Sequence, residues 1–170
     1  MPSGERTGLF AIVVTRIAGL WILVGALLKL FVGAPEDLPQ IVQDLPLELG
    51  LTYRLAIAAE MAIGLLSLLR PRWAWLILIL LLVMFDAVLV TQVVEGAPSC
   101  GCFGSKIPVP PVVVLAIDSL LLLLLLASRP WATPGSDATA PLVLAAVVGV
   151  AVALPWVFDR QVKGPGGGSI

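Results

Sequence analysis

The sequence predicts an all-α membrane protein, a polytopic bundle of spanning helices. Of its 170 residues, 59% are hydrophobic and only 12% are charged, and the mean hydropathy is +1.08. An ordinary soluble domain carries roughly twice that share of charged residues. Five long apolar runs take up most of the chain, which leaves no room for a large domain outside the bilayer.

Each of these runs has the length of a spanning helix. They cover residues 8–32, 51–69, 73–94, 109–127 and 141–158. A helix crosses about 30 Å of hydrocarbon with roughly 20 residues. The first run is too long for the apolar part of a signal peptide and contains Arg16 and Lys29, so it is expected to stay in the membrane.

The chain divides into a core and an addition. Residues 1–128 hold the first four runs and are expected to form a four-helix transmembrane core. Residues 129–140 are rich in proline and glycine and predict a linker. The fifth helix, residues 141–158, is therefore expected to be an addition to the core, and the Gly-rich residues 159–170 predict a disordered tail.

Basic residues predict the orientation in the membrane. If the helices alternate, four arginines fall on one side: Arg6, Arg70, Arg72 and Arg129. Positive charge in short loops marks the cytoplasmic side. We therefore expect a multi-pass protein of a bacterial cytoplasmic membrane, with its N-terminus inside. The opposite, extracytoplasmic side is expected to receive the loop with Cys100 and Cys102 and an acidic loop, residues 34–50. Apolar residues between Pro39 and Pro46 in the acidic loop predict a short surface helix.

Composition excludes several kinds of site. The net charge of −1 and the absence of a basic cluster argue against nucleic acid as a partner. Without histidine, the chain lacks the commonest zinc ligand and the usual acid–base residue, so no metal site is predicted. Two thiolates still suit a soft ion such as Cu(I), an alternative that ranks below thiol exchange.

The strongest candidates for chemistry are the only two cysteines, Cys100 and Cys102, which lie in a loop between the third and fourth runs. Gly101 between them supplies the backbone freedom that a very small disulfide ring needs. Such a ring is strained and exchanges readily, whereas a structural disulfide normally closes a longer loop. We interpret the pair as catalytic redox cysteines; the alternative is two small apolar residues packed in a turn.

Six ionisable residues lie within the predicted spans: Arg16, Lys29, Arg54, Glu60, Asp86 and Asp118. Exposure to lipid at the centre of a helix costs on the order of 3 kcal/mol, so all six are expected to face the interior and to pair. Small residues share a face with Lys29 (Ala18 and Gly25) and with Glu60 (Ala56 and Gly64) and predict close helix approach. A contact between Lys29 and Glu60 is expected, with Arg54 and Arg16 as competing partners for the same acid. Asp86 and Asp118 are each expected to neutralise a basic residue, the alternative being a proton relay. Lys29 and Arg54 lie near the cysteine end of their helices and are expected to favour a cysteine thiolate.

Together these residues resemble the MauE/DoxX family of redox-associated membrane proteins over residues 8–127. The resemblance rests on Arg16, Gly19, Gly25 and Lys29, on Glu60 with Gly64, and on the block Cys100-Gly101-Cys102-Phe103-Gly104. It implies a four-helix core and thiol–disulfide electron transfer. MauE is associated with maturing the small, disulfide-rich subunit of methylamine dehydrogenase, alongside a thioredoxin-like partner. The fifth helix and the lack of a basic residue near Asp118 mark this chain as a divergent member.

The leading functional hypothesis is a thiol–disulfide oxidoreductase in the lipid bilayer. Cys100 and Cys102 would take electrons from a thioredoxin-like periplasmic protein and pass them to a membrane acceptor, for which a quinone is the candidate. Since the chain has a single cysteine pair, either the quinone approaches the loop directly or another protein completes the circuit. Two alternatives stay open: a non-enzymatic scaffold subunit, and a small-molecule or metal transporter suggested by the intramembrane charges.

Overall fold

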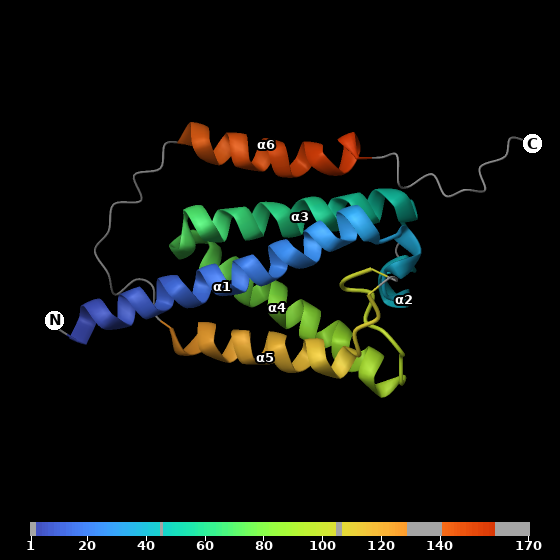
Figure 1. Cartoon of the computed structure of the whole chain (residues 1–170), viewed down its shortest axis with the longest axis horizontal. Coiled ribbons are helices and arrows are strands. Elements are labelled where there is room, and N and C mark those ends of the chain that lie inside the picture. Colours follow the sequence, from blue (N-terminus) through green and yellow to red (C-terminus); the bar gives the residue numbers. More distant parts are fainter. Residues whose placement is uncertain (1–2, 45, 105–106, 129–140, 159–170) are drawn as a thin grey trace, which may run out of the picture.

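The computed structural model describes residues 3–44, 46–104, 107–128 and 141–158, and within these ranges its regular structure is entirely helical. The elements are α1 (Ser3–Val32), the 3-10 helix η1 (Pro35–Asp37), α2 (Gln40–Gln43), α3 (Leu49–Leu69), α4 (Pro71–Val94), α5 (Pro111–Ala127) and α6 (Pro141–Val157) (Figure 1). The predicted all-α fold class is confirmed. The predicted linker, 129–140, and tail, 159–170, lie outside the described residues.

In the described part of the chain, three helices are long and apolar enough to cross a membrane, namely Gly8–Val32 within α1, and the whole of α3 and α4. Helices α5 and α6 are apolar but have 17 residues each, which rise roughly 26 Å. All five predicted runs therefore form helices. That α5 and α6 also span the bilayer stays a prediction.

Proline residues mark where several helices begin. Pro71, Pro111 and Pro141 occupy the first positions of α4, α5 and α6, where the missing N–H of proline breaks no helical hydrogen bond. Arg70 alone joins α3 to α4. Its N–H donates to the Leu66 carbonyl at 2.7 Å, and its own carbonyl accepts the N–H of Ala74 at 3.1 Å. The result is a tight helical hairpin.

Glycine residues let α1 and α3 pack closely. A Cβ atom on Gly64 would lie 2.9 Å from Leu23 Cβ and 3.0 Å from the Gly19 carbonyl oxygen, and one on Gly19 would overlap the Ser67 side chain. Side chains larger than hydrogen would therefore separate the two helices. The predicted close approach is confirmed at Gly64, but on α1 it involves Gly19 instead of the predicted Ala18 and Gly25, since a Cβ atom on Gly25 would meet Cys102 and Phe103.

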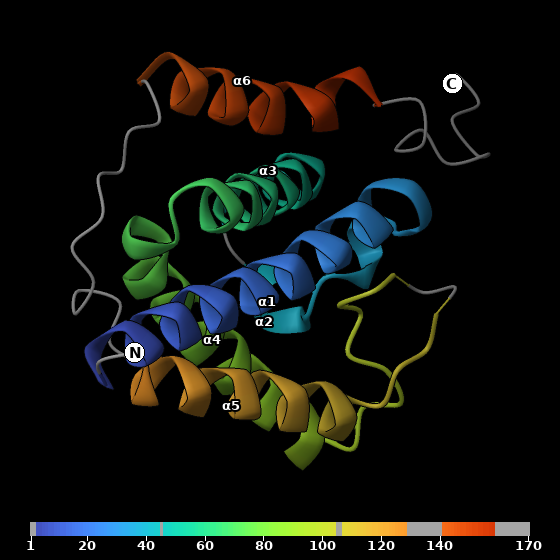
Figure 2. The ribbon, with the colours of Figure 1, turned by 60° about the vertical axis from the view of Figure 1, so that its left-hand side comes forward.

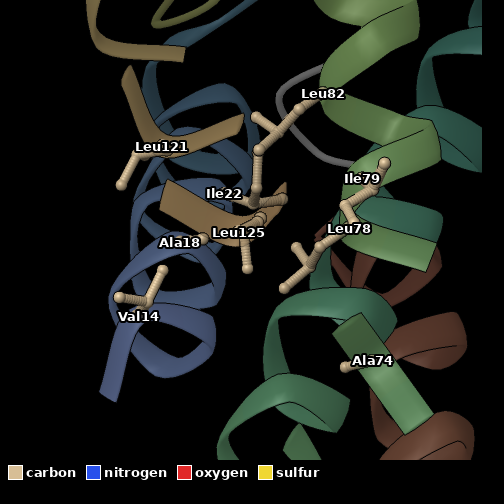
Figure 3. Close-up of a cluster of buried hydrophobic side chains, with 9 residues drawn as sticks. All are labelled: Val14, Ala18, Ile22, Ala74, Leu78, Ile79, Leu82, Leu121 and Leu125. Atoms are coloured by element: carbon tan, nitrogen blue, oxygen red, sulfur yellow. The ribbon is translucent and has the colours of Figure 1, made fainter. Parts of the chain in front are cut away.

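A buried apolar cluster holds α1, α4 and α5 together. Its side chains come from these three helices (Figure 3) and are Val14, Ala18, Ile22, Ala74, Leu78, Ile79, Leu82, Leu121 and Leu125. Trp75 adds a hydrogen bond between α4 and α5, because its Nε1 donates to the Leu125 carbonyl at 2.9 Å. Helix α6 packs on α3, on the side away from α4 and α5 (Figure 2), where Ala151 is fully buried.

The two ends of the bundle differ. One end carries η1, α2 and the loop between α4 and α5, and the Arg70 turn lies at the other (Figure 1). We call the first the Cys end. The predicted short helix between Pro39 and Pro46 is α2. Leu38 and Val42 pack beside Leu30 and Tyr53, so this segment covers the ends of α1 and α3.

Candidate functional site

The loop between α4 and α5, residues 95–110, holds both cysteines and is called the Cys loop. Backbone hydrogen bonds fix it, from Cys100 N–H to the Val109 carbonyl at 3.1 Å and from Gly104 N–H to the Gly101 carbonyl at 3.1 Å. Gln92 of α4 adds a third bond, since its Nε2 donates to the Cys100 carbonyl at 3.3 Å. The cysteines therefore occupy a defined position on the helix bundle.

Two glycines bring the Cys loop against the preceding segments. Gly101 and Gly104 have φ angles of +68° and +84°, a region that side chains other than glycine rarely adopt. A Cβ atom on Gly101 would overlap the Asp37 carbonyl of η1, and one on Gly104 would lie 2.8 Å from Gly33 Cα. Gly101 thus has a second role beyond the predicted freedom of a disulfide ring, namely close contact with η1.

The two thiols differ in burial and acidity. Both cysteines are free; Cys100 is 1% exposed, whereas Cys102 is partly exposed. The Cys102 N–H donates to Cys100 Sγ at 3.2 Å. Hydrogen bonding from the Cys102 thiol, helped by this N–H and by the charge of Lys29, lowers the pKa of Cys100 to about 7 despite its burial. The same thiol contact, together with burial, raises the pKa of Cys102. Cys100 is therefore the more acidic thiol of the pair.

Lys29 and Glu60 form the predicted ion pair. Lys29 Nζ lies 2.5 Å from Glu60 Oε1, and the two side chains are 11% and 6% exposed. The ammonium group also lies 5.6 Å from the centre of the Phe85 ring, a distance suited to a cation–π contact. Tyr53 fixes the backbone of the same turn, because its hydroxyl donates to the Lys29 carbonyl at 2.7 Å.

Asp118 is buried and Asp86 is half-buried, and among the described residues both accept hydrogen bonds from neutral side chains, so the prediction that each neutralises a basic residue is wrong. Trp21 Nε1 donates to Asp118 Oδ1 at 2.7 Å, and Ser119 Oγ donates to Asp86 Oδ2 at 3.1 Å. Neutral donors therefore hold both acids. Trp21 also contacts Phe103 of the Cys loop edge to face, with ring centres 5.4 Å apart. The indole explains why the Asp118 region needs no basic residue.

Three predicted supporting residues lie away from the thiols. Arg16 is exposed on α1, so the prediction that it faces the interior is wrong. The thirteen residues between Arg16 and Lys29 turn them to different faces of one helix. Arg54 is half-buried in α3, and neither Arg54 nor Asp86 lines the two cavities that border the cysteines. The positive charge near the thiols comes from Lys29.

Two cavities lie beside the cysteine pair, and Cys102 lines both of them. The larger, about 310 Å³, is lined by both thiols and by residues of α1, η1, α2, α3 and α4, including Lys29 and Glu60. The smaller, about 20 Å³, lies against Cys102, Trp21 and Asp118 and has room for roughly one water molecule. Lys29 and Glu60 line both. Among the described residues, no three His, Cys, Asp or Glu side chains group as metal ligands would.

Some residues of the site were missed in the sequence. Gln92 was not predicted as a site residue, although a polar residue near the end of an apolar run, close to the cysteines in sequence, could have indicated it. Trp21 and Asp118 are 97 residues apart in sequence, and Trp21 resembles any aromatic residue of a spanning helix. Their contact became visible only once α1 and α5 were placed side by side.

Comparison with known protein families gives a match that covers most of the chain. The model of the family described as methylamine utilisation protein MauE matches residues 7–132. This segment contains all of α3, α4 and α5, nearly all of α1 and both cysteines, and it ends before α6. No curated protein and no solved structure matches the chain.

Proposed function

The chain belongs to the family of the methylamine utilisation protein MauE, and we propose that it is a membrane thiol–disulfide redox protein that exchanges electrons with a thioredoxin-like partner. The proposal rests on one observation. Two thiols of different exposure and acidity, Cys100 and Cys102, lie together on a loop fixed at one end of a membrane helix bundle.

The difference between the thiols assigns a role to each. Cys102 is partly exposed, so a protein thiolate can reach its sulfur, whereas Cys100 is 1% exposed and shielded by the loop. In thiol–disulfide exchange, the departing thiol leaves faster when its pKa is low. The pKa of about 7 makes Cys100 the better leaving group of the pair.

The exchange starts from the Cys100–Cys102 disulfide. A partner thiolate attacks Cys102 Sγ, the bond between the two cysteines breaks, and Cys100 leaves as a thiolate. The second partner thiol loses its proton and attacks the partner sulfur of the mixed disulfide, and Cys102 leaves and takes up a proton. The partner loses two electrons as its disulfide forms, and the cysteine pair gains two.

The proposal places the Cys end outside the cytoplasm of a bacterial cell. Arg70 and Arg72 lie at the opposite end of the bundle, and the acidic residues Glu36 and Asp37 lie at the Cys end (Figure 1). This distribution fits the rule that basic loops stay in the cytoplasm. It would give the cysteines the oxidising periplasm, where disulfide exchange is sustained.

A scaffold function is the second candidate, and one observation favours it. Cys100 packs with Leu89, Phe103 and Val114 in a buried cluster, which is also how a purely structural cysteine behaves. In that case Cys102 would have no special reactivity toward a thioredoxin-like protein.

Trapping of the mixed disulfide tests the proposal. The probe is a thioredoxin whose second active-site cysteine is serine and whose first is activated as a disulfide with nitrothiobenzoate. In membranes, Cys100→Ser leaves the reachable Cys102, and a covalent adduct is expected. Cys102→Ser leaves only the shielded Cys100, and little adduct is expected. Non-reducing gels measure both.

The double variant is the control for background reaction, and membrane levels of all variants must match. Equal adducts from the two single variants would contradict the assignment of roles. No adduct from either one would remove the redox proposal and favour the scaffold.

A further inference from the structure

The larger cavity has the properties of a small-molecule site. At about 310 Å³, it falls at the lower end of the roughly 300–1,000 Å³ typical of such sites. Most of its wall is apolar, with Leu38 and Val42 at the Cys end and Ala56 and Val88 on α3 and α4. Cys100 and Cys102 form part of the same wall, so a bound molecule would lie beside the two cysteines.

The cavity reaches the outer surface of the bundle within the membrane-spanning part. Met84 of α4 lines it and is 54% exposed. Met84 lies ten residues before Val94, the end of α4, or roughly 15 Å along the helix axis. Helices α3 and α4 diverge from each other, so that the space between them widens from the Arg70 turn toward the Cys end (Figure 1). A lipid-soluble molecule can therefore enter sideways from the hydrocarbon.

The few polar groups of the wall specify what kind of molecule fits. Gln92 is 8% exposed, and its Oε1 has no hydrogen-bond partner among the described residues, while its Nε2 is used by the Cys100 carbonyl. A buried acceptor without a donor is unfavourable, so a ligand hydroxyl is expected there. Lys29 has three N–H donors and directs one to Glu60, so it also suits a ligand carbonyl.

We propose that this cavity binds a membrane quinone that reoxidises Cys100 and Cys102 directly. The inference rests on the proposed function and names its electron acceptor. The Cys100 thiolate and the Cys102 thiol lose two electrons and one proton as the S–S bond forms. The quinone gains the two electrons, this proton and a second proton from water, and becomes a quinol with two new O–H bonds. Its carbonyl suits Lys29 before the reaction, and its hydroxyl suits Gln92 afterwards. The single cysteine pair then passes its two electrons to the quinone without a second protein.

Reduction of a soluble quinone tests the inference. Full-length protein in lipid nanodiscs, with both cysteines reduced, is mixed anaerobically with decylubiquinone. Quinol formation is followed by ultraviolet absorbance, and remaining thiols are counted by alkylation. We expect quinol formation with the matching loss of two thiols for each quinol. Cys100→Ser and Cys102→Ser should each form none.

Matched substitutions on two helices test whether the cavity is the site. Ala56→Phe and Val88→Phe fill it from α3 and α4, while Ala59→Phe and Val90→Phe add the same ring on exposed faces of the same helices. The two variants that fill the cavity should lower kcat/KM for decylubiquinone at least roughly tenfold. The two exposed-face variants should leave kcat/KM within about twofold of wild type. All four should form the thioredoxin adduct normally in the Cys100→Ser background.

Two results would overturn the inference while leaving the proposed function intact. One is that wild type reduces decylubiquinone no faster than Cys100→Ser, although the thioredoxin adduct still forms. The other is that the exposed-face variants slow the reaction as much as the filling variants, which indicates partitioning into lipid. Loss of both quinone reduction and adduct formation would remove the proposed function as well.

Discussion

Cys100 and Cys102 are separated by one residue, yet their surroundings are different. Cys100 packs in a buried cluster with Leu89, Phe103 and Val114, whereas Cys102 is partly exposed and borders both cavities. The Cys102 thiol and N–H both stabilise a thiolate at Cys100. The chemistry proposed for the pair depends on this asymmetry at single residues.

The acidity of Cys100 predicts a pH dependence for the reduced protein. A pKa lowered to about 7 means that thiolate appears as pH rises through about 7, well below the roughly 8.5 of an ordinary thiol. Ultraviolet thiolate absorbance should show this midpoint. Cys102→Ala removes the thiol donor, so the midpoint should move upward. A wild-type midpoint in the ordinary thiol range, or one unchanged in Cys102→Ala, would be inconsistent with the structure.

The ion pair of Lys29 and Glu60 predicts a stability effect. Glu60→Gln leaves a buried ammonium group without its carboxylate, which should cost about 3 kcal/mol of unfolding free energy and lower the Tm measured in detergent. Replacing both residues, as Lys29→Met with Glu60→Leu, should recover much of this loss because no buried charge remains.

Arg16→Met serves as the control for the ion pair, because Arg16 is an exposed basic residue on the same helix. Its Tm should stay close to that of wild type. If Arg16→Met lowered the Tm as much as Glu60→Gln, general loss of charge rather than the ion pair would be responsible.

Among the elements, the Cys loop depends most on backbone geometry. Gly96, Gly101 and Gly104 all have positive φ, but their surroundings differ. A Cβ atom would meet Asp37 or Gly33 at the last two positions, and nothing within 4 Å at Gly96. Contact between the loop and the segment after α1 therefore keeps Cys100 covered.

Alanine substitutions at these glycines separate the contact from the backbone strain. Alanine at any of the three positions would be held at positive φ, which costs roughly 1 kcal/mol. Only Gly101→Ala and Gly104→Ala are also expected to displace the loop, because their Cβ atoms would meet other segments. In a Cys102→Ser background, maleimide should label Cys100 at least roughly tenfold faster in these two variants, because local opening exposes it. Gly96→Ala should keep Cys100 protected. Equal labelling of all three would show that the contact is unimportant.

The whole molecule is a helix bundle with chemically different ends. Helices α1, α3 and α4 are long enough to span a membrane, and the tight turn at Arg70 puts Arg70 and Arg72 opposite the Cys loop (Figure 1). Helix α6 lies outside the segment matched by the family model and packs on α3. The orientation of this bundle decides which compartment the thiols face.

Labelling of intact cells tests the orientation. A membrane-impermeant maleimide should reach Cys102 from outside in the Cys100→Ser variant. In a cysteine-free background, Trp73→Cys places a thiol near the Arg70 turn, where Trp73 is 66% exposed. That thiol should react only after the cells are permeabilised. The reverse pattern would place the Cys end in the cytoplasm.

The sequence by itself determined the helices, the membrane class and the cysteine pair as the candidate site. Hydropathy acts residue by residue, so run lengths predict helices whatever their neighbours are. It also predicted the contact of Lys29 with Glu60, although only Gly64 among the small residues used for this prediction lies where α1 and α3 meet. The environment of Arg16, the neutral donors of Asp86 and Asp118, and the cavity beside Cys100 were decided only by the tertiary structure. Each depends on how far every helix is rotated and shifted against the others, and packing between distant segments sets those quantities.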